Sequence, residues 1–218
     1  MKNIFSNKKA IIVLIACSLI TIIIAIIMKI TFFKPKPLTE IKTNTVYIGG
    51  SRSEYPDNDQ SRYYIEFKDN KTFILMDDCS RGTIDDYDQD GDGSHPYIKI
   101  IYGKYVIDRN NRYILSKAKS AYVEFKDVGA VNSNVINYYY TRTFSQYEVM
   151  TERVFTNNKG NYILSRTSMD TKTIDKKWYY YIYNKSDIKK LPSSVEEFRK
   201  QFKMDKKVEQ KRLAEQSQ

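Results

Sequence analysis

The sequence predicts a mainly β protein, an antiparallel barrel or sandwich of about ten short strands, with an N-terminal transmembrane helix and a C-terminal amphipathic helix. Short runs rich in Tyr, Ile, Val, Phe and Thr follow one another through the middle of the chain. Polar turns of Asp, Asn, Gly and Ser separate them, as antiparallel hairpins require. One long apolar run stands near the N-terminus, and a helical pattern returns only after residue 192.

The apolar run Ala10–Met28 contains 19 residues and no charge. At about 1.5 Å per residue it reaches about 28 Å, close to the hydrocarbon thickness of a bilayer. Basic residues flank it on both sides, and the segment before it is short and basic, which favours an N-terminus inside and a C-terminus outside. We therefore expect a single-pass protein of the cell membrane with a cytoplasmic N-terminus (1–9), a signal anchor (10–30), a stalk (31–44) and an extracytoplasmic remainder.

Cys17, one of the two cysteines, offers an alternative interpretation of the apolar run, as the anchor of a lipoprotein. Leu14–Cys17 resembles the site at which bacterial lipoproteins are cleaved and lipidated, but the chain stays apolar after Cys17, so a cysteine within a span is the favoured interpretation. Cys79 lies in the polar part. Because the two thiols are expected in different phases, we predict no disulfide between them.

The exterior part from 45 to 191 is predicted to form one β-rich domain. Two of its hairpins share a strand, an Asn-containing turn and the letters Tyr-Ile-Leu-Ser, at 113–116 and 162–165. This indicates repeated hairpins. The expected strands are Thr45–Ile48, Arg62–Lys68, Thr72–Met76, Tyr97–Ile107, Arg112–Ser116, Ala121–Phe125, Asn134–Arg142, Tyr147–Phe155, Asn161–Arg166 and Lys177–Tyr183.

Three segments, Phe67–Phe73, Tyr102–Ile107 and Tyr113–Leu115, share a sequence pattern with a known class of domain. A strand ends in a polar turn and an aromatic residue, and a Gly-x-Tyr and a short apolar strand follow. The pattern resembles lipocalin-like extracytoplasmic domains of bacterial membrane-anchored surface proteins. The resemblance implies a small barrel with one open end. It assigns no functional residue, because the family has no fixed catalytic set.

The end of the chain, 192–218, changes character. Ser193 and Glu196 have the spacing of a capping box that begins a helix. Val195, Phe198 and Phe202 would then fall on one helical face and dock on the barrel. Beyond residue 203 the chain is mostly Lys, Glu, Gln and Arg, and we expect a solvated tail.

The net charge of +10 does not indicate nucleic-acid binding. Residues 1–36 carry six lysines and no acid, which leaves 10 − 6 = +4 for the rest of the chain. Lysines at the flanks of a membrane span account for most of the excess. We therefore expect no nucleic-acid partner.

The loop before residue 97 contains the most specific local motif. Asp86, Asp88, Asp90 and Asp92 alternate, and Gly91 stands where a calcium loop needs its sharp turn. The residue that should supply the bidentate glutamate is Tyr97, so another part of the chain would have to complete the site. The motif predicts a calcium site at these four aspartates, and the alternative is an acidic hairpin loop.

The remaining features indicate binding more than catalysis. Tyr179, Tyr181 and Tyr183 share one face of the last strand and form a candidate binding row, although strand propensity alone would also explain them. His95 is the only histidine, and no nucleophile, zinc or phosphate-loop motif is present. We predict a non-enzymatic, membrane-tethered binding or accessory module facing a cell-wall polymer, a peptide or a neighbouring membrane protein. The alternatives are an assembly subunit of an envelope complex and a carboxylate-dependent hydrolase.

Overall fold

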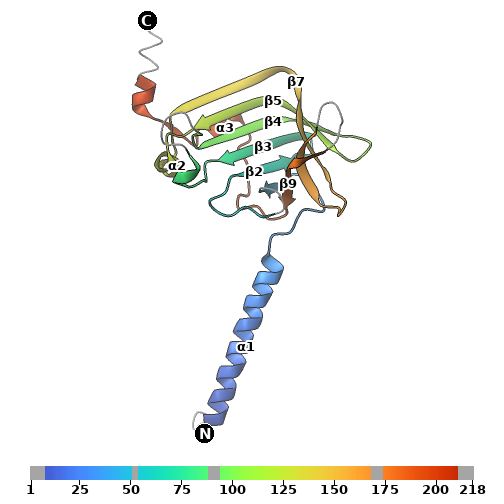
Figure 1. Cartoon of the computed structure of the whole chain (residues 1–218), viewed down its shortest axis with the longest axis vertical. Helices are drawn as coiled ribbons and strands as arrows, with labels where there is room; N and C mark the ends of the chain where they lie inside the picture. Colours follow the sequence, from blue (N-terminus) through green and yellow to red (C-terminus); the bar gives the residue numbers. More distant parts are fainter. Residues whose placement is uncertain (1–7, 51–53, 88–93, 168–173, 211–218) are drawn as a thin grey trace. The chain divides into compact units, whose positions relative to one another are not determined.

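The computed structural model describes residues 8–50, 54–87, 94–167 and 174–210 of the chain (Figure 1). They divide into two compact units, 1–36 and 37–218. The first contains the helix α1 (Lys8–Phe33), whose large apolar side chains between Ile11 and Ile26 are exposed. Among the described residues, which include α1 side chains only from 11 to 26, no helix qualifies by length and apolarity as a membrane span.

The second unit is a closed antiparallel barrel with the strand order β1-β2-β3-β4-β5-β7-β8-β9, which confirms the prediction of a mainly β barrel. Figure 1 shows β2, β3, β4, β5 and β7 following one another around it. The strands are β1 (Val46–Gly49), β2 (Arg62–Phe67), β3 (Thr72–Cys79), β4 (Tyr97–Ile107), β5 (Tyr113–Glu124), β7 (Tyr138–Thr156), β8 (Tyr162–Thr167) and β9 (Ile174–Tyr183).

The predicted number of strands was wrong at two places. Arg112–Ser116 and Ala121–Phe125 are parts of the single strand β5, and Asn134–Arg142 and Tyr147–Phe155 fall largely within β7. The polar residues that suggested a break in β5 mark register irregularities in its pairing with β7, between Ile114 and Ser116 and between Lys117 and Lys119. A bulge interrupts the hydrogen-bond ladder but lets the strand continue.

Three hairpin turns share one backbone geometry, which confirms the predicted repetition. In each turn, two hydrogen bonds involve the same first residue, which is Lys68, Asp108 or Asn157. Its N–H donates to the carbonyl four residues later, and its own carbonyl accepts from the N–H three residues later. The residues at that third position, Lys71, Asn111 and Gly160, all have positive φ. This is the geometry of a type I turn followed by a left-handed residue.

The end of the barrel that carries these turns is covered by residues 37–45. Leu38 is 5% exposed and packs in the inner apolar cluster, its N–H donating to the Ile182 carbonyl at 2.6 Å. The Lys42 N–H donates to the Tyr47 hydroxyl at 2.7 Å, and the Asn44 N–H to the Phe67 carbonyl at 2.7 Å. Part of the predicted stalk, 31–44, therefore packs against the barrel and closes this end of it.

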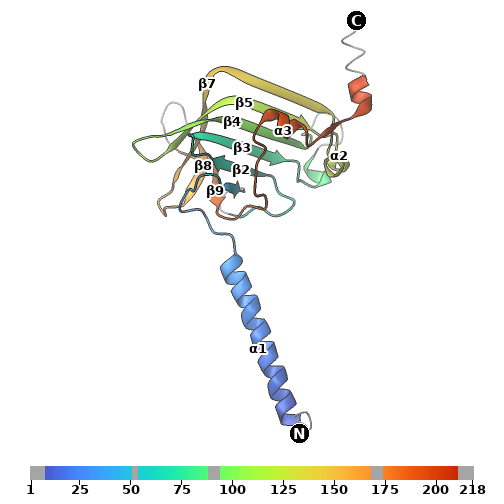
Figure 2. The same cartoon turned by 180° about the vertical axis from the view of Figure 1, so that it is seen from behind.

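The outer face of β1–β5 is covered by the C-terminal segment, which Figure 2 shows from behind. Leu191, Phe198 and Phe202 are buried there against an outer apolar cluster that includes Ile48, Tyr64 and Ile100. The predicted helix exists as α3 (Val195–Arg199), but it is short: Phe202 lies beyond its end and still docks. Its N-cap is Ser194, whose hydroxyl accepts from the Glu197 N–H at 3.1 Å, one residue later than predicted.

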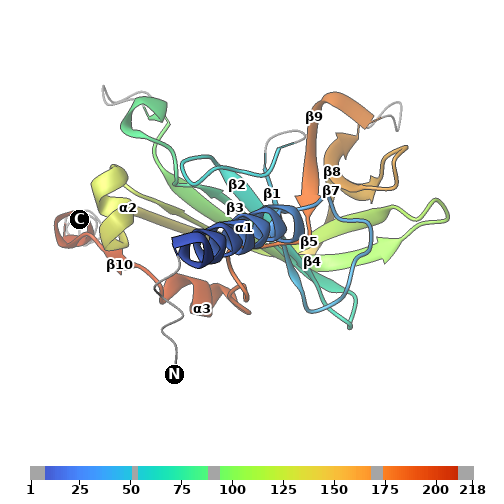
Figure 3. The same cartoon turned by 90° about the horizontal axis from the view of Figure 1, so that it is seen from below.

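Four further small elements lie between the barrel strands or near the C-terminus. The 3-10 turn η2 (Ile84–Asp86) follows β3, and the helix α2 (Val128–Ser133) connects β5 to β6 (Val135–Ile136). β6 pairs in parallel with β10 (Lys203–Met204), and Figure 3 shows α2, β10 and α3 on one side of the barrel. The prediction of no helix before residue 192 missed α2, because six residues are too few for a helical period.

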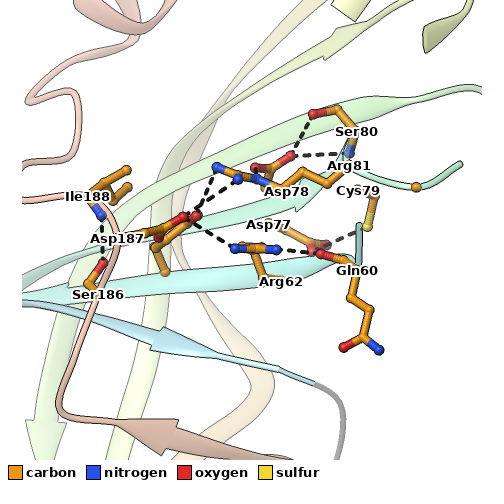
Figure 4. A network of polar contacts seen from close by, with 12 residues as sticks. Gln60, Arg62, Asp77, Asp78, Cys79, Ser80, Arg81, Ser186, Asp187 and Ile188 are labelled. Atoms are coloured by element: carbon orange, nitrogen blue, oxygen red, sulfur yellow. Dashed lines mark hydrogen bonds and ion pairs between the residues drawn. The ribbon is translucent and has the colours of Figure 1, made fainter. Parts of the chain in front are cut away.

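A network of ion pairs between side chains holds the segment before α3 against β2 and β3 (Figure 4). Asp187 pairs with Arg62 at 3.3 Å and with Arg81 at 3.6 Å. Arg81 also pairs with Asp78 at 2.7 Å and donates to the Tyr64 hydroxyl at 3.2 Å. The Arg62 side chain is 2% exposed, so its charge depends on such partners.

We predict that Asp187→Ala destabilises the protein by about 1–2 kcal/mol, because it leaves the buried Arg62 guanidinium short of an acceptor. The loss of stability is expected at the lower end of this range, because the Asp187 side chain is 35% exposed and solvent partly screens its ion pairs. Urea unfolding of the full chain measures it. Lys189→Ala, an exposed neighbour, is the matched control and should change stability by less than about 0.5 kcal/mol. Equal losses in the two variants would contradict the role given to Asp187.

Candidate functional site

A cavity of about 410 Å³ occupies the barrel interior at the end opposite the covered one. It lies where β1, β3 and β8 end and where β2, β4 and β9 begin, and Gly50, Ser61 and Cys79 line it at this end. The inner apolar cluster fills the rest of the interior as far as the segment 37–45. The barrel is therefore a cup with one closed end.

The floor of the cavity is apolar. Leu75, Ile101, Met150 and Leu164 line it, and each is also part of the inner cluster, at 5–7% exposure. They come from four different strands because alternate residues of each strand face inward. A ligand that reached this depth would exchange water for aliphatic side chains.

An acid lies directly above this floor. Asp77 is two residues beyond Leu75 on β3 and therefore shares its inward face, while Asp78 faces outward to Arg81. Asp77 accepts a hydrogen bond from the Cys79 thiol at 3.6 Å, shown in Figure 4. Burial raises the pKa of the Asp77 carboxyl, and only the smaller effects of Cys79 and Lys99 oppose it.

The Cys79 thiol next to Asp77 is held in its neutral form. Burial raises its pKa, and the neighbouring Asp77 carboxylate raises it further. A nucleophilic cysteine needs the opposite environment, with cations or a helix N-terminus that lower the thiol pKa. Cys79 is therefore a hydrogen-bond donor to Asp77 and a poor nucleophile.

Two cations and a second acid lie further out on the wall. Glu152 pairs with Arg166 at 3.3 Å across the β7–β8 pair, and its other oxygen accepts from the Thr151 hydroxyl at 3.1 Å. Lys99 stands opposite Asp77 in the β3–β4 register, but its side chain is exposed, and within the described residues no ion pair joins the two. Glu152 is thus already neutralised, whereas Asp77 is not.

Tyrosines form the third part of the wall. Tyr63 and Tyr180 meet edge to face at 5.6 Å between ring centroids, and Tyr97 stacks on Tyr122 at 5.3 Å. Burial is the main cause that raises the pKa of Tyr63, Tyr97 and Tyr180, so their hydroxyls stay protonated. The Tyr63 ring lies across Gly49, where an added Cβ would sit 2.0 Å from a ring carbon, so only glycine permits this close approach.

A second hollow of about 450 Å³ adjoins the cavity and shares Ser61, Cys79 and Tyr97 with it. His95 lines this outer hollow, together with Asp59 and Asp86. The only histidine of the chain is therefore at the mouth and does not line the inner cavity.

The calcium motif is only partly within the described residues. Asp88, Asp90 and Asp92 lie outside them. The Asp86 carboxylate accepts from the Thr83 N–H at 2.6 Å and from its hydroxyl at 2.9 Å, which stabilises η2. No group of three or more potential metal ligands occurs among the described residues, and the calcium site stays a prediction.

The predicted tyrosine row lies on the outer side of β9. Tyr183 is 3% exposed in the outer cluster, Tyr181 packs against that cluster and accepts from Asn157 at 3.0 Å, and Tyr179 meets Tyr181 edge to face. The tyrosine of this strand that lines the cavity is Tyr180. Their proposed binding role remains a prediction. The sequence analysis did not single out Asp77, although the alternation of Phe73, Leu75 and Asp77 places it on the inward face of β3.

No family model, curated protein or solved structure matches this chain. The function must therefore be argued from the cavity itself.

We predict that Asp77→Asn stabilises the protein at neutral pH. A carboxyl whose folded-state pKa is raised contributes stability below its unfolded value, about 3.9, and loses it as pH rises through the folded value. An amide cannot ionise, so the variant should unfold at higher urea than wild type at pH 7, with the difference disappearing near pH 3.

Asp69→Asn is the control of opposite sign. Hydrogen bonds from Thr43 and Asn44 lower the pKa of Asp69, so its replacement should weaken the protein at pH 7. A less stable Asp77→Asn variant at pH 7 would contradict the assignment of Asp77 as a desolvated acid.

Proposed function

We propose that this protein is a membrane-tethered extracytoplasmic binding module without catalytic activity, and that its ligand occupies the barrel cavity. The observation that carries the proposal is the cup itself, with a closed floor and a cavity of about 410 Å³. Apolar walls with a few convergent polar groups are typical of small-molecule sites, and the volume is in their usual range. A lipocalin-like role, with a wall polymer, a peptide or a membrane protein as the source of the ligand, fits this arrangement.

The tether is argued from the sequence of the whole N-terminal segment. Nineteen uncharged residues, Ala10–Met28, fall within the 26-residue helix α1. Ile12 is 65% exposed and Val13 60%, and a helix with apolar residues on all sides needs an apolar environment to cover them. A bilayer supplies one, with the short basic N-terminus inside.

The absence of catalysis is proposed from the chemistry of the wall. Cys79 is held as a neutral thiol, Asp77 is a desolvated acid, and His95 lines the outer hollow. Catalysis by nucleophile and base needs these groups in hydrogen-bond reach of one another and with matched pKa values. The cavity supports recognition of a ligand better than its conversion.

A carboxylate hydrolase is the second candidate, because two acids from different strands, Asp77 and Glu152, line one cavity. Their environments differ: Asp77 is desolvated, while Glu152 is paired with Arg166. Such a division is how one carboxyl serves as acid and another as base or nucleophile. A hydrolase would lose turnover in both Asp77→Asn and Glu152→Gln, whereas a binding module has none to lose.

We predict that the full chain binds the neutral fluorescent probe N-phenyl-1-naphthylamine in the cavity, with empty nanodiscs as the blank. Met150→Trp should weaken binding about tenfold, because the larger side chain fills the floor at a cost of about 1–3 kcal/mol. Val149→Trp is the matched control, since Val149 is the adjacent residue of β7, is 55% exposed and does not line the cavity. Equal binding by both variants would place the probe elsewhere and remove the support for a cavity ligand.

We predict that the chain, expressed in a bacterial host with a C-terminal tag, remains in the membrane after alkaline carbonate extraction. Protease added to spheroplasts should remove the tag from outside, because the barrel is proposed to face away from the cytoplasm. A tag protected from protease would contradict the orientation, and extraction into the supernatant would contradict the tether. Cys17→Ser decides the alternative: membrane association survives it for a spanning helix and is lost for a lipidated cysteine.

A further inference from the structure

The cavity is lined by one acid that has no ion partner among the described residues. Glu152 is paired with Arg166, and the outward Asp78 is paired with Arg81. Asp77 accepts a weak hydrogen bond from Cys79, and Lys99, its partner in the strand register, also lines the cavity but is exposed and forms no ion pair with Asp77 among the described residues. Cys79 and Lys99 offset only part of the effect of desolvation on this half-buried carboxylate, and an unpaired charge that is partly removed from water is costly.

The position of Asp77 determines what could compensate it. The carboxyl stands between an aliphatic floor, which includes Leu75 and Ile101, and a wall of tyrosine rings from Tyr63, Tyr97 and Tyr180. Aromatic faces attract cations and have little affinity for anions. A ligand group that met the Asp77 carboxylate here would gain a charge-assisted hydrogen bond and ring contacts together.

The described mouth of the cavity favours the same sign of charge. Asp59 and Asp86 line the outer hollow that adjoins the cavity through Ser61, Cys79 and Tyr97. A mouth lined by acids concentrates cations and repels anions. The three basic residues that line the cavity do not reverse this, because Arg62 is paired with Asp187, Arg166 is paired with Glu152 and Lys99 is exposed to solvent.

We propose that the cavity takes a small organic cation, in which a protonated amine is joined to an apolar or aromatic body. The ammonium group lies at Asp77 among the tyrosine rings, and the body lies on the floor formed by Leu75, Ile101, Met150 and Leu164. This inference rests on the proposed cavity-binding function and names the ligand class for it.

Three probes of similar size and different charge test the inference on the full chain in nanodiscs at pH 7: 2-phenylethylamine, 2-phenylethanol and 3-phenylpropionate. Isothermal titration should give an amine affinity at least about tenfold above that of the alcohol, the factor expected from one charge-assisted hydrogen bond. The anion should bind more weakly than the alcohol, because Asp77 and the acidic mouth repel it.

Asp77→Asn should reduce the amine affinity at least about tenfold, to that of the alcohol, and leave the alcohol unchanged, because the amide has the same shape and no charge. Glu152→Gln is the matched control and should preserve the preference for the amine, since Glu152 is already paired. A preference that survives Asp77→Asn, or is lost only in Glu152→Gln, would overturn the assignment to Asp77.

The outcomes separate this inference from the function on which it rests. If the wild-type chain binds 2-phenylethanol as tightly as the amine, or binds 3-phenylpropionate most tightly, the cavity remains a ligand site. The proposed preference for an organic cation is then wrong. Failure of all three probes to bind would overturn the cavity-binding proposal as well.

Discussion

Closure of the barrel is the constraint on which the other features depend. β1 has only four residues, and it meets β9 through two register pairs, Ile48 with Tyr183 and Gly49 with Ile182. The preceding segment extends this seam, because Pro37 bridges Tyr183 and the Leu38 N–H donates to the Ile182 carbonyl at 2.6 Å. Without this seam β1 and β9 would be open edges, and the cavity would lose the wall that contains Gly49 and Tyr180.

Closure also creates an outer face, and half of that face is covered. All six residues of β2 are buried, which a half-exposed antiparallel strand would not show. Its inward residues, such as Ile65, pack in the barrel, while Tyr64 packs outward beneath the C-terminal segment. The part of β7 from Tyr138 to Val149 differs, because Tyr138, Tyr140 and Val149 are exposed. The outer face of the barrel is thus covered along β1–β5 and exposed to solvent along the first part of β7.

The sequence predicted local structure better than long-range structure. It identified the turns at 69–71, 108–111 and 156–160 from their polar residues, and two of the three residues at positive φ are Asn111 and Gly160, which favour that conformation locally. It identified Phe198 and Phe202 as docking residues from their spacing. It divided β5 and β7 too often, because a bulge and a loop look alike in composition. The cavity could not be predicted, since Asp77, Glu152 and Arg166 meet only through strand pairing across about ninety residues.

The adjacent acids Asp77 and Asp78 show how the two faces depend on one register. Asp78 belongs to the outer network with Arg81 and Ser80, and Asp77 belongs to the cavity. A slip of β3 by one residue would place Asp77 outside, bury Asp78 in the interior and exchange Leu75 with Ile74 between the two clusters. The outer network with Asp78 therefore opposes such a slip by stabilising one register. The contacts that fix the C-terminal segment on the outside thereby also position Asp77 inside.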